Sequence, residues 1–317
     1  MNRPATSDAA TVLYATSESG QRPAAEAVDD APPRRPPPRS PLRRLAGRLS
    51  VLGLIGLAIV VFWLGVAFIG PLVAPYKGGA ITSTEIFGSY SAAHPLGTDF
   101  LGRDMLSRVL YGTQYTVGLA LAATLLASGI GTFFGLFAAV SPRWVDEVLS
   151  RLFDALISIP SKVLALVVIA AYGSSVPMLI TVAALAYIPG AFRISRSLAV
   201  NLMTLEYVQV ARARGEGLFY IARVEVLPNM IHPMLADFGL RFVFIVLLLS
   251  GLSFLGLGVQ PPNADWGSLV RENIGGLAEG APAVLMPAIA IATLTVGVNL
   301  LIDSLRRHSG RAHGGAK

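Results

Sequence analysis

Residues 51–73 read VLGLIGLAIVVFWLGVAFIGPLV, an apolar run of 23 residues that contains no charged side chain. A helix needs about 20 apolar residues to cross the hydrocarbon core of a bilayer, so this run is long enough for one crossing. It begins too far from the N-terminus, and continues too long, to be a secretory signal peptide. The run therefore predicts a transmembrane helix and places the chain among integral membrane proteins.

Five further apolar stretches follow along the 317-residue chain. The second of these five is weaker than the others because Pro160 and Lys162 interrupt it. Only 14% of the residues are charged, whereas soluble domains contain roughly 25%. We predict an all-α bundle of about six transmembrane helices, at 51–73, 115–140, 155–172, 176–192, 236–258 and 283–302. Gly131 and Gly135 in the 115–140 span form a small-xxx-small pair that permits close helix contact.

Lysine and arginine residues are distributed unevenly around these spans. If the N-terminus is cytoplasmic, 21 of the 25 fall in cytoplasmic segments, and the exceptions are Lys77, Arg103, Arg108 and Arg271. Cytoplasmic loops of membrane proteins hold the excess of basic residues. The distribution predicts that both termini are cytoplasmic, and it explains the net charge of +6 without a nucleic-acid partner.

Composition divides the chain into four regions. Residues 1–48 are rich in proline and arginine and predict a disordered cytoplasmic tail, because they cannot bury enough apolar surface to offset the entropy of ordering. A ligand for an SH3-type domain is the alternative interpretation of this tail. Residues 49–113 hold the first transmembrane helix and an extracytoplasmic loop, 114–304 the transmembrane core, and 305–317 a cytoplasmic C-terminal tail.

The sequence lacks the motifs of the common enzyme classes. It has no cysteine, and none of its three lysines, Lys77, Lys162 and Lys317, follows a glycine-rich phosphate-binding loop. The four histidines are scattered without paired metal-ligand spacing, and no GxSxG-type nucleophile motif occurs. We therefore expect no catalytic, cofactor or metal site, so that an ATP-driven process would need a separate ATPase.

The longest cytoplasmic loop lies within 193–235 and includes LMTLEYVQVARARGEGLFYIARVEVLPNMIHP at 202–233. It predicts two short helices joined at a glycine. Thr204 is expected to cap the first helix, and Gly215 to supply the left-handed residue that ends it. The second helix is expected to stop at Pro228. Such an elbow is suited either to insertion into a partner's groove or to lying on anionic lipid, and the residues leave both open.

Part of this loop, EYVQVARARG…VLPN within 206–229, resembles the cytosolic EAA loop of ABC-importer permeases. In that family the pattern is Glu-Ala-Ala, three residues, Gly, nine residues and Ile-x-Leu-Pro. The residues that match at this spacing are Ala211, Gly215, Leu227 and Pro228. The departures are Gln209, Val210 and Glu225, which stand where the family has Glu, Ala and Ile.

Three further blocks resemble the C-type permease subunits of dipeptide and oligopeptide importers. They are HPLGTDFLGRDMLSRVLYG at 94–112, LSFLGLGVQPPNADWGSLVREN at 252–273 and VNLLIDSLRR at 298–307. The blocks occur in the family's order, and the resemblance extends over about 45–307. The chain is therefore identified as a member of this family by similarity in four separate places.

The resemblance implies a permease of a type I, binding-protein-dependent ABC importer in the bacterial inner membrane. It implies a second homologous permease subunit, cytosolic ATP-binding subunits and an extracytoplasmic substrate-binding protein as partners. Peptide is the substrate that it favours, with nickel and glutathione as alternatives. It places coupling to the ATPase at Glu206, Ala211, Arg212, Gly215, Leu227 and Pro228.

The two outer blocks hold further candidate residues. Asp99, Arg103, Asp104 and Arg108 predict either a compact loop closed by local ion pairs or a surface that faces substrate or a partner. Trp266 is expected to anchor the outer membrane interface, where tryptophan is favoured, or to stack on a ligand. The candidates for an extracytoplasmic or partner surface are therefore Asp99, Arg103, Asp104 and Trp266.

Two other classes of function remain open from the residues alone. An ion-driven secondary transporter would need an intramembrane carboxylate or a broken helix at the midplane. We expect neither, because Asp237 and Asp303 fall at the ends of predicted spans. A scaffold that recruits a cytosolic partner without transport would use the same loop, and only an ATP-hydrolysing partner would separate it from an importer.

Overall fold

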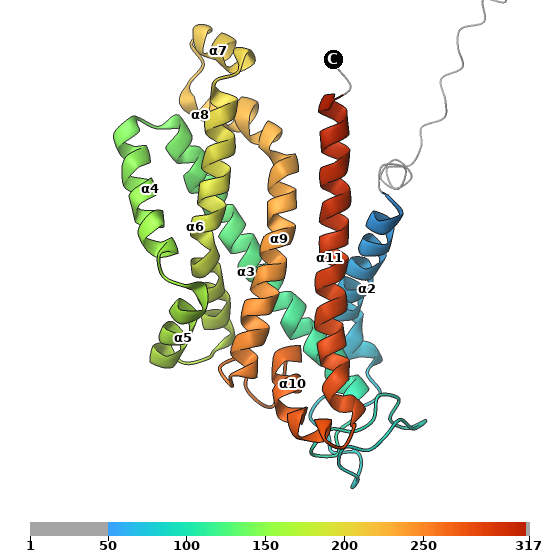
Figure 1. Cartoon of the computed structure of the whole chain (residues 1–317). Helices are drawn as coiled ribbons and strands as arrows, with labels where there is room; N and C mark the ends of the chain where they lie inside the picture. The colour runs from blue at the N-terminus through green and yellow to red at the C-terminus, as the bar shows by residue number, and fades with distance from the viewer. Residues whose placement is uncertain (1–49, 315–317) are drawn as a thin grey trace, which may run out of the picture. The chain divides into compact units, whose positions relative to one another are not determined.

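The computed structural model describes residues 50–314, and the side chains of 50–306. The helices that it describes belong to one compact unit, 42–317, and are drawn in Figure 1. The predicted disordered tail at 1–48 lies outside the described residues. So does the end of the predicted C-terminal tail.

Five helices in the described part are long and apolar enough to cross a membrane. They are α2 (Val51–Val73), α3 (Met105–Val140), α6 (Val176–Met203), α9 (Leu227–Phe254) and α11 (Pro282–Gly314). A sixth span results if α4 (Arg143–Ile157) and α5 (Ser161–Tyr172) are counted together, although a bend of 79° separates them. The predicted all-α bundle of about six spans is confirmed.

Several helices extend beyond the apolar runs that predicted them. The first residue of α3 is Met105 instead of 115, because the Asp104 carboxylate caps the helix by accepting a hydrogen bond from the Ser107 backbone N–H. Helix α6 continues past 192 to Met203, and α9 begins at Leu227 instead of 236. Hydropathy marks the part of a helix inside the lipid, whereas caps and tertiary packing decide where the helix ends.

Short helices connect the long ones. On one side of the bundle they are α7 (Glu206–Ala213), α8 (Leu218–Tyr220) and the π-helix η1 (Ile221–Val226), which leads directly into α9. On the other side they are α10 (Trp266–Asn273) and the 3₁₀ turn η2 (Ile274–Leu277), as Figure 1 shows.

The predicted cap at the start of the first loop helix and the predicted stop of the second are wrong. Thr204 does not cap the first helix, since it ends α6 and its hydroxyl donates to the Asn201 carbonyl oxygen at 2.8 Å. Pro228 does not stop the second helix, because helical turns continue through η1 into the first turn of α9. Proline is tolerated at the start of an α-helix, where no intrahelical bond requires its missing N–H.

Glycines allow α3 and α6 to pack closely, as the pair Gly131 and Gly135 predicted. A Cβ atom at Gly131 would lie 2.4 Å from the Cβ of Ala191, and one at Gly135 would lie 2.8 Å from the backbone nitrogen of Arg196. Real Cβ atoms essentially never approach so closely. Backbone contact of this kind is a usual way to join helices in lipid.

A valine at Gly131 should therefore force α3 and α6 apart. We expect Gly131→Val to destabilise the purified protein by about 1–3 kcal/mol, the usual cost of overpacking. Gly129→Val is the matched control, because a Cβ atom there has no neighbour within 4 Å. Thermal unfolding in detergent measures both, and equal melting temperatures would contradict the packing role of Gly131.

Asp237 lies within α9 rather than at the end of that helix. It is the eleventh residue of α9 and its carboxylate pairs with Arg241 at 2.6 Å, with both residues less than 10% exposed. Arg241 also donates to the Tyr187 carbonyl oxygen of α6 at 2.7 Å. Helix α9 begins earlier than its apolar run, and the buried charges are tolerated because they are paired.

Candidate functional site

The segment 206–226, here called the elbow, ends its first helix at a left-handed glycine. Gly215 has a φ of +82°, the conformation in which a side chain would be strained. The N–H of Gly215 donates to the Arg212 carbonyl oxygen at 2.9 Å. The N–H of Glu216 donates to the Ala211 carbonyl oxygen at 3.2 Å. These two bonds form a Schellman motif, which fixes the direction in which the chain leaves α7. The predicted left-handed conformation of Gly215 is confirmed.

Buried apolar residues attach the elbow to the ends of α6 and α9. The cluster consists of Ala199, Met203, Val208, Ala211, Ile221, Val226 and Met230. The side-chain amide of Gln209 adds a hydrogen bond of 2.9 Å to the Met203 carbonyl oxygen at the end of α6. The elbow is thus attached to two membrane helices.

The elbow exposes several large apolar residues although it belongs to a loop. Phe219 is 77% exposed, and Val210, Leu218 and Tyr220 are exposed as well. Contiguous exposed apolar residues mark sites of contact with proteins or membranes. The aromatic pair Phe219 and Tyr220 was not among the predicted site residues, although the run LFY in a polar loop is a signal for it.

The six predicted coupling residues occupy different environments. Glu206, Arg212, Gly215 and Pro228 are exposed, so a partner can reach them. Ala211 is fully buried, and as a contact surface it is therefore a wrong prediction. Its methyl group packs inside the elbow because the helix turns that face toward α6.

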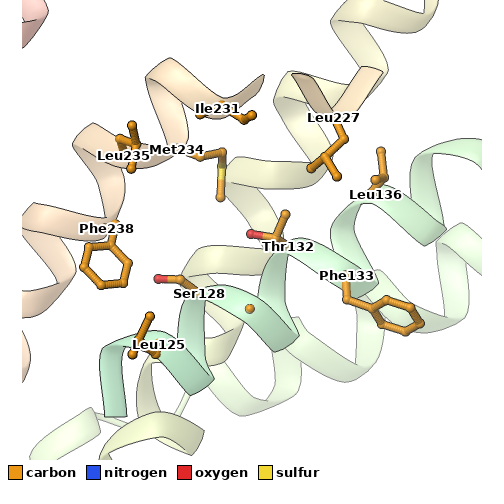
Figure 2. A pocket seen from close by; sticks show the side chains of 11 residues that line it. Leu125, Ser128, Thr132, Phe133, Leu136, Leu227, Ile231, Met234, Leu235 and Phe238 are labelled. Atoms are coloured by element: carbon orange, nitrogen blue, oxygen red, sulfur yellow. The ribbon is translucent and has the colours of Figure 1, made fainter. Parts of the chain in front are cut away.

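Leu227 lies in a groove between α3 and α9 rather than on the outward face. The groove holds about 500 Å³ and is lined by Leu125, Ser128, Gly129, Thr132, Phe133, Leu136, Leu227, Ile231, Met234, Leu235 and Phe238. Figure 2 shows side chains from the two helices facing one another across it. None of these lining residues is charged. Leu227 therefore joins the elbow to the helix packing beneath it.

At the opposite side of the bundle, four charged residues form a buried network. The Asp99 carboxylate accepts from Arg103 at 2.6 Å and from Arg108 at 2.7 Å. Both arginines also pair with Glu272 of α10, at 3.2 and 2.8 Å. The network joins the long loop between α2 and α3, the start of α3 and α10, which confirms the predicted local ion pairs and adds a partner distant in sequence.

The predicted outer surface is largely an interior. Asp99, Asp104 and Trp266 are each at most 1% exposed, so they cannot contact a partner in this conformation. Asp104 is occupied by capping α3 and by a 3.0 Å contact with Nδ1 of His94. These residues hold the loop together because it folds back onto α3.

Trp266 does not anchor the membrane interface. Its indole N–H donates to the Val109 carbonyl oxygen at 3.2 Å, and its ring contacts Trp63 of α2 edge to face. The preceding residue, Asp265, caps α10 and is 1% exposed. Burial raises the pKa of Asp265, and hydrogen bonds from Ser253 and Ser268 oppose that rise.

Comparison with known proteins relates this architecture to one family. Residues 131–312 match the family model of the binding-protein-dependent transport system inner membrane component. The match covers more than half of the chain and includes the elbow. The chain belongs to this family. It is a multi-pass protein of the bacterial inner membrane and a permease subunit of an ABC importer.

Individual relatives of the permease agree with that assignment. A Brucella suis protein described as a peptide transport system permease is 36% identical over 83% of this chain and 88% of its own length. The dipeptide transport system permease of Alkalihalophilus pseudofirmus is 30% identical over 86% of this chain and 93% of its own. The glutathione transport system permease of Pectobacterium atrosepticum is 33% identical over 68% of this chain and 72% of its own length.

The pair α4 and α5 bears on the choice between an importer and an ion-driven transporter. The sequence predicted no broken helix at the midplane, and this pair is bent by 79° at a break of the kind seen in broken spans and re-entrant loops. Pro160 precedes α5 and Ser158 ends α4, so the helix cannot continue across the pair. Family membership, and not the absence of a broken helix, therefore decides between an ABC importer and an ion-driven transporter.

Proposed function

We propose that this permease is one of two homologous membrane subunits of an ATP-driven peptide importer. ATPase subunits bind its elbow, and an extracytoplasmic binding protein delivers the substrate to the opposite side. Support for a peptide substrate comes from the relatives, whose names specify a peptide, a dipeptide and glutathione. Both termini are cytoplasmic, in agreement with the distribution of lysine and arginine.

The observation that supports coupling most directly is the exposed apolar face of an otherwise anchored elbow. Phe219 and Val210 project from a segment whose other face is packed against α6 and α9. A partner that grips the exposed face transmits its displacement to both helices, because the buried cluster leaves no room for sliding. ATP-driven closure of the ATPases then changes the opening of the pathway.

Truncating Phe219 tests this surface. We expect Phe219→Ala to weaken binding of the ATPase subunits at least tenfold, because large aromatic residues contribute most to such contacts. Phe68→Ala is the matched control, since Phe68 of α2 is also 77% exposed but lies in a membrane span. Binding is measured by titrating purified ATPase onto the permeases in nanodiscs.

The same titration distinguishes an importer from a scaffold. Importer variants that lose ATPase binding should also lose uptake in proportion. If Phe219→Ala and Phe68→Ala bind the ATPase equally, the elbow is not the coupling surface. A cytosolic partner that binds the elbow without hydrolysing ATP would favour the scaffold.

A further inference from the structure

The depth of the break between α4 and α5 is inferred from the residues that lie beside it on α6 and α9. The Tyr187 hydroxyl of α6 donates to the Phe244 carbonyl oxygen of α9 at 3.3 Å, and it lies near the side chain of Ser161, the first residue of α5. Phe244 lies ten residues before the end of α9, and Tyr187 lies eleven residues after the start of α6. Each is thus about 15 Å from that helix end. With these two ends at the edge of the hydrocarbon core, which is roughly 30 Å thick, the break lies near the middle of the membrane.

The backbone at this break is not covered by the permease itself. Ser158, Ile159 and Pro160 are all exposed, and α5 begins without a side-chain cap. Non-helical backbone at membrane depth is tolerated only where it is buried in protein or lines a water-filled cavity. This face of the permease therefore does not contact lipid in the assembled importer.

Lys162 is the second residue of α5, directly after the break, and has no partner among the described side chains. Its side chain is exposed, and among the side chains described, 50–306, none forms an ion pair or hydrogen bond with it. A charge inside a membrane is costly and is retained where it faces a partner, a ligand or water. At mid-depth the ammonium is too far from the headgroups on either side to reach them with its four-carbon stem.

The exposed face of α2 has the composition expected of a surface in contact with lipid, and it provides a comparison within the same molecule. Its most exposed large residues, Leu72 and Phe68, are apolar, and the whole helix contains no charge. The exposed residues of α4 and α5 include apolar ones and also charged ones such as Asp154 and Lys162. The two faces therefore have different surroundings, and only the α2 face is suited to hydrocarbon.

Further charges continue from the break toward the elbow side of the bundle. Asp154 of α4 pairs with Arg193 of α6 at 2.7 Å, and both side chains are more than half exposed. Asp146 and Arg196 form a second pair between the same two helices. A polar track thus leads from Lys162 along α4 and α6, as a hydrated path for a charged solute would require.

We propose that Lys162, at the break of the third span, is a cargo-binding residue of the translocation pathway that pairs with a carboxylate of the peptide. This inference rests on the proposed peptide-import function. A peptide with a free C-terminus carries a carboxylate, and crossing the membrane removes water from that group. A single exposed lysine offsets that loss while holding the carboxylate weakly enough to release it, as conduction requires.

Uptake of labelled dialanine by the complete importer in vesicles, with its binding protein, tests the proposal. We expect Lys162→Gln to reduce uptake at least tenfold, and Lys162→Arg to keep at least half of it. Lys77→Gln, a change at an exposed lysine of the outer loop, is the control and should have no effect. ATP hydrolysis stimulated by the loaded binding protein should be unchanged in Lys162→Gln, because the elbow is intact.

Each other outcome has a definite meaning. Normal uptake by Lys162→Gln would overturn the proposal and leave the importer assignment intact. Loss of subunit assembly or of stimulated ATP hydrolysis would also overturn it, because Lys162 would then bind a carboxylate of the second permease. A wild-type complex that does not transport dialanine would contradict the peptide function itself.

The absence of cysteine from the chain allows a test that does not depend on cargo. In the assembled importer, Lys162→Cys should react with a charged, membrane-impermeant thiosulfonate added from the aqueous phase. Phe68→Cys on the lipid-exposed face of α2 should not react. Failure of Lys162→Cys to react would show that water does not reach this position and would overturn the proposal.

Discussion

Gly215→Val is expected to leave the permease inserted in the membrane at its normal level and to reduce ATP-driven uptake to background. A Cβ atom at Gly215 meets no other atom within 4 Å, so the substitution causes no clash. The cost is the left-handed backbone, about 1–2 kcal/mol for a residue with a Cβ atom. The elbow relieves that cost by changing the direction of the chain after α7, which breaks the two bonds of the Schellman motif and reorients Phe219.

Two companion variants separate conformation from bulk. Gly217 has an extended conformation, with φ −72° and ψ 157°, and a Cβ atom there also meets nothing within 4 Å. Gly217→Val should therefore transport normally. Gly215→Asn should retain most uptake, because asparagine tolerates the left-handed conformation. Normal uptake by Gly215→Val, at an unchanged level in the membrane, would contradict the coupling role of this residue.

Asp99→Asn is expected to have the largest effect on stability. The change removes the carboxylate shared by Arg103 and Arg108 and leaves one of them, Arg108, 3% exposed with only Glu272 as a partner. Removing one member of a buried ion pair usually costs about 3–5 kcal/mol. Thermal unfolding in detergent should show the loss as a lower melting temperature.

An exposed ion pair in the same protein provides the control. Arg143 and Glu147 are 2.8 Å apart, with side chains 92% and 61% exposed. Glu147→Gln should change the free energy of unfolding by less than about 1 kcal/mol, because water already solvates both charges. Equal shifts for Asp99→Asn and Glu147→Gln would show that the outer network does not stabilise the fold.

Some of the candidate site could be predicted from local sequence and some could not. The left-handed conformation of Gly215 was predictable because it depends on the residues of one helix end. The role of Glu272 was not predictable, since it lies 164 residues from Arg108 and meets it only after α10 folds back. Likewise, the burial of Ala211 and Trp266 follows from contacts with helices distant in sequence.

The sequence by itself determined that this protein crosses the membrane several times, because uncharged runs such as 51–73 are stable as helices only in lipid or a protein interior. It also determined the family, through blocks whose order and spacing are local properties. Only the tertiary structure decided the environment of each charge. It placed Asp237 in a buried pair, Asp99 in a network and Lys162 beside the break between α4 and α5. The reason is physical: the cost of a charge in a membrane depends on its depth and its partners, and both are set by how the helices pack.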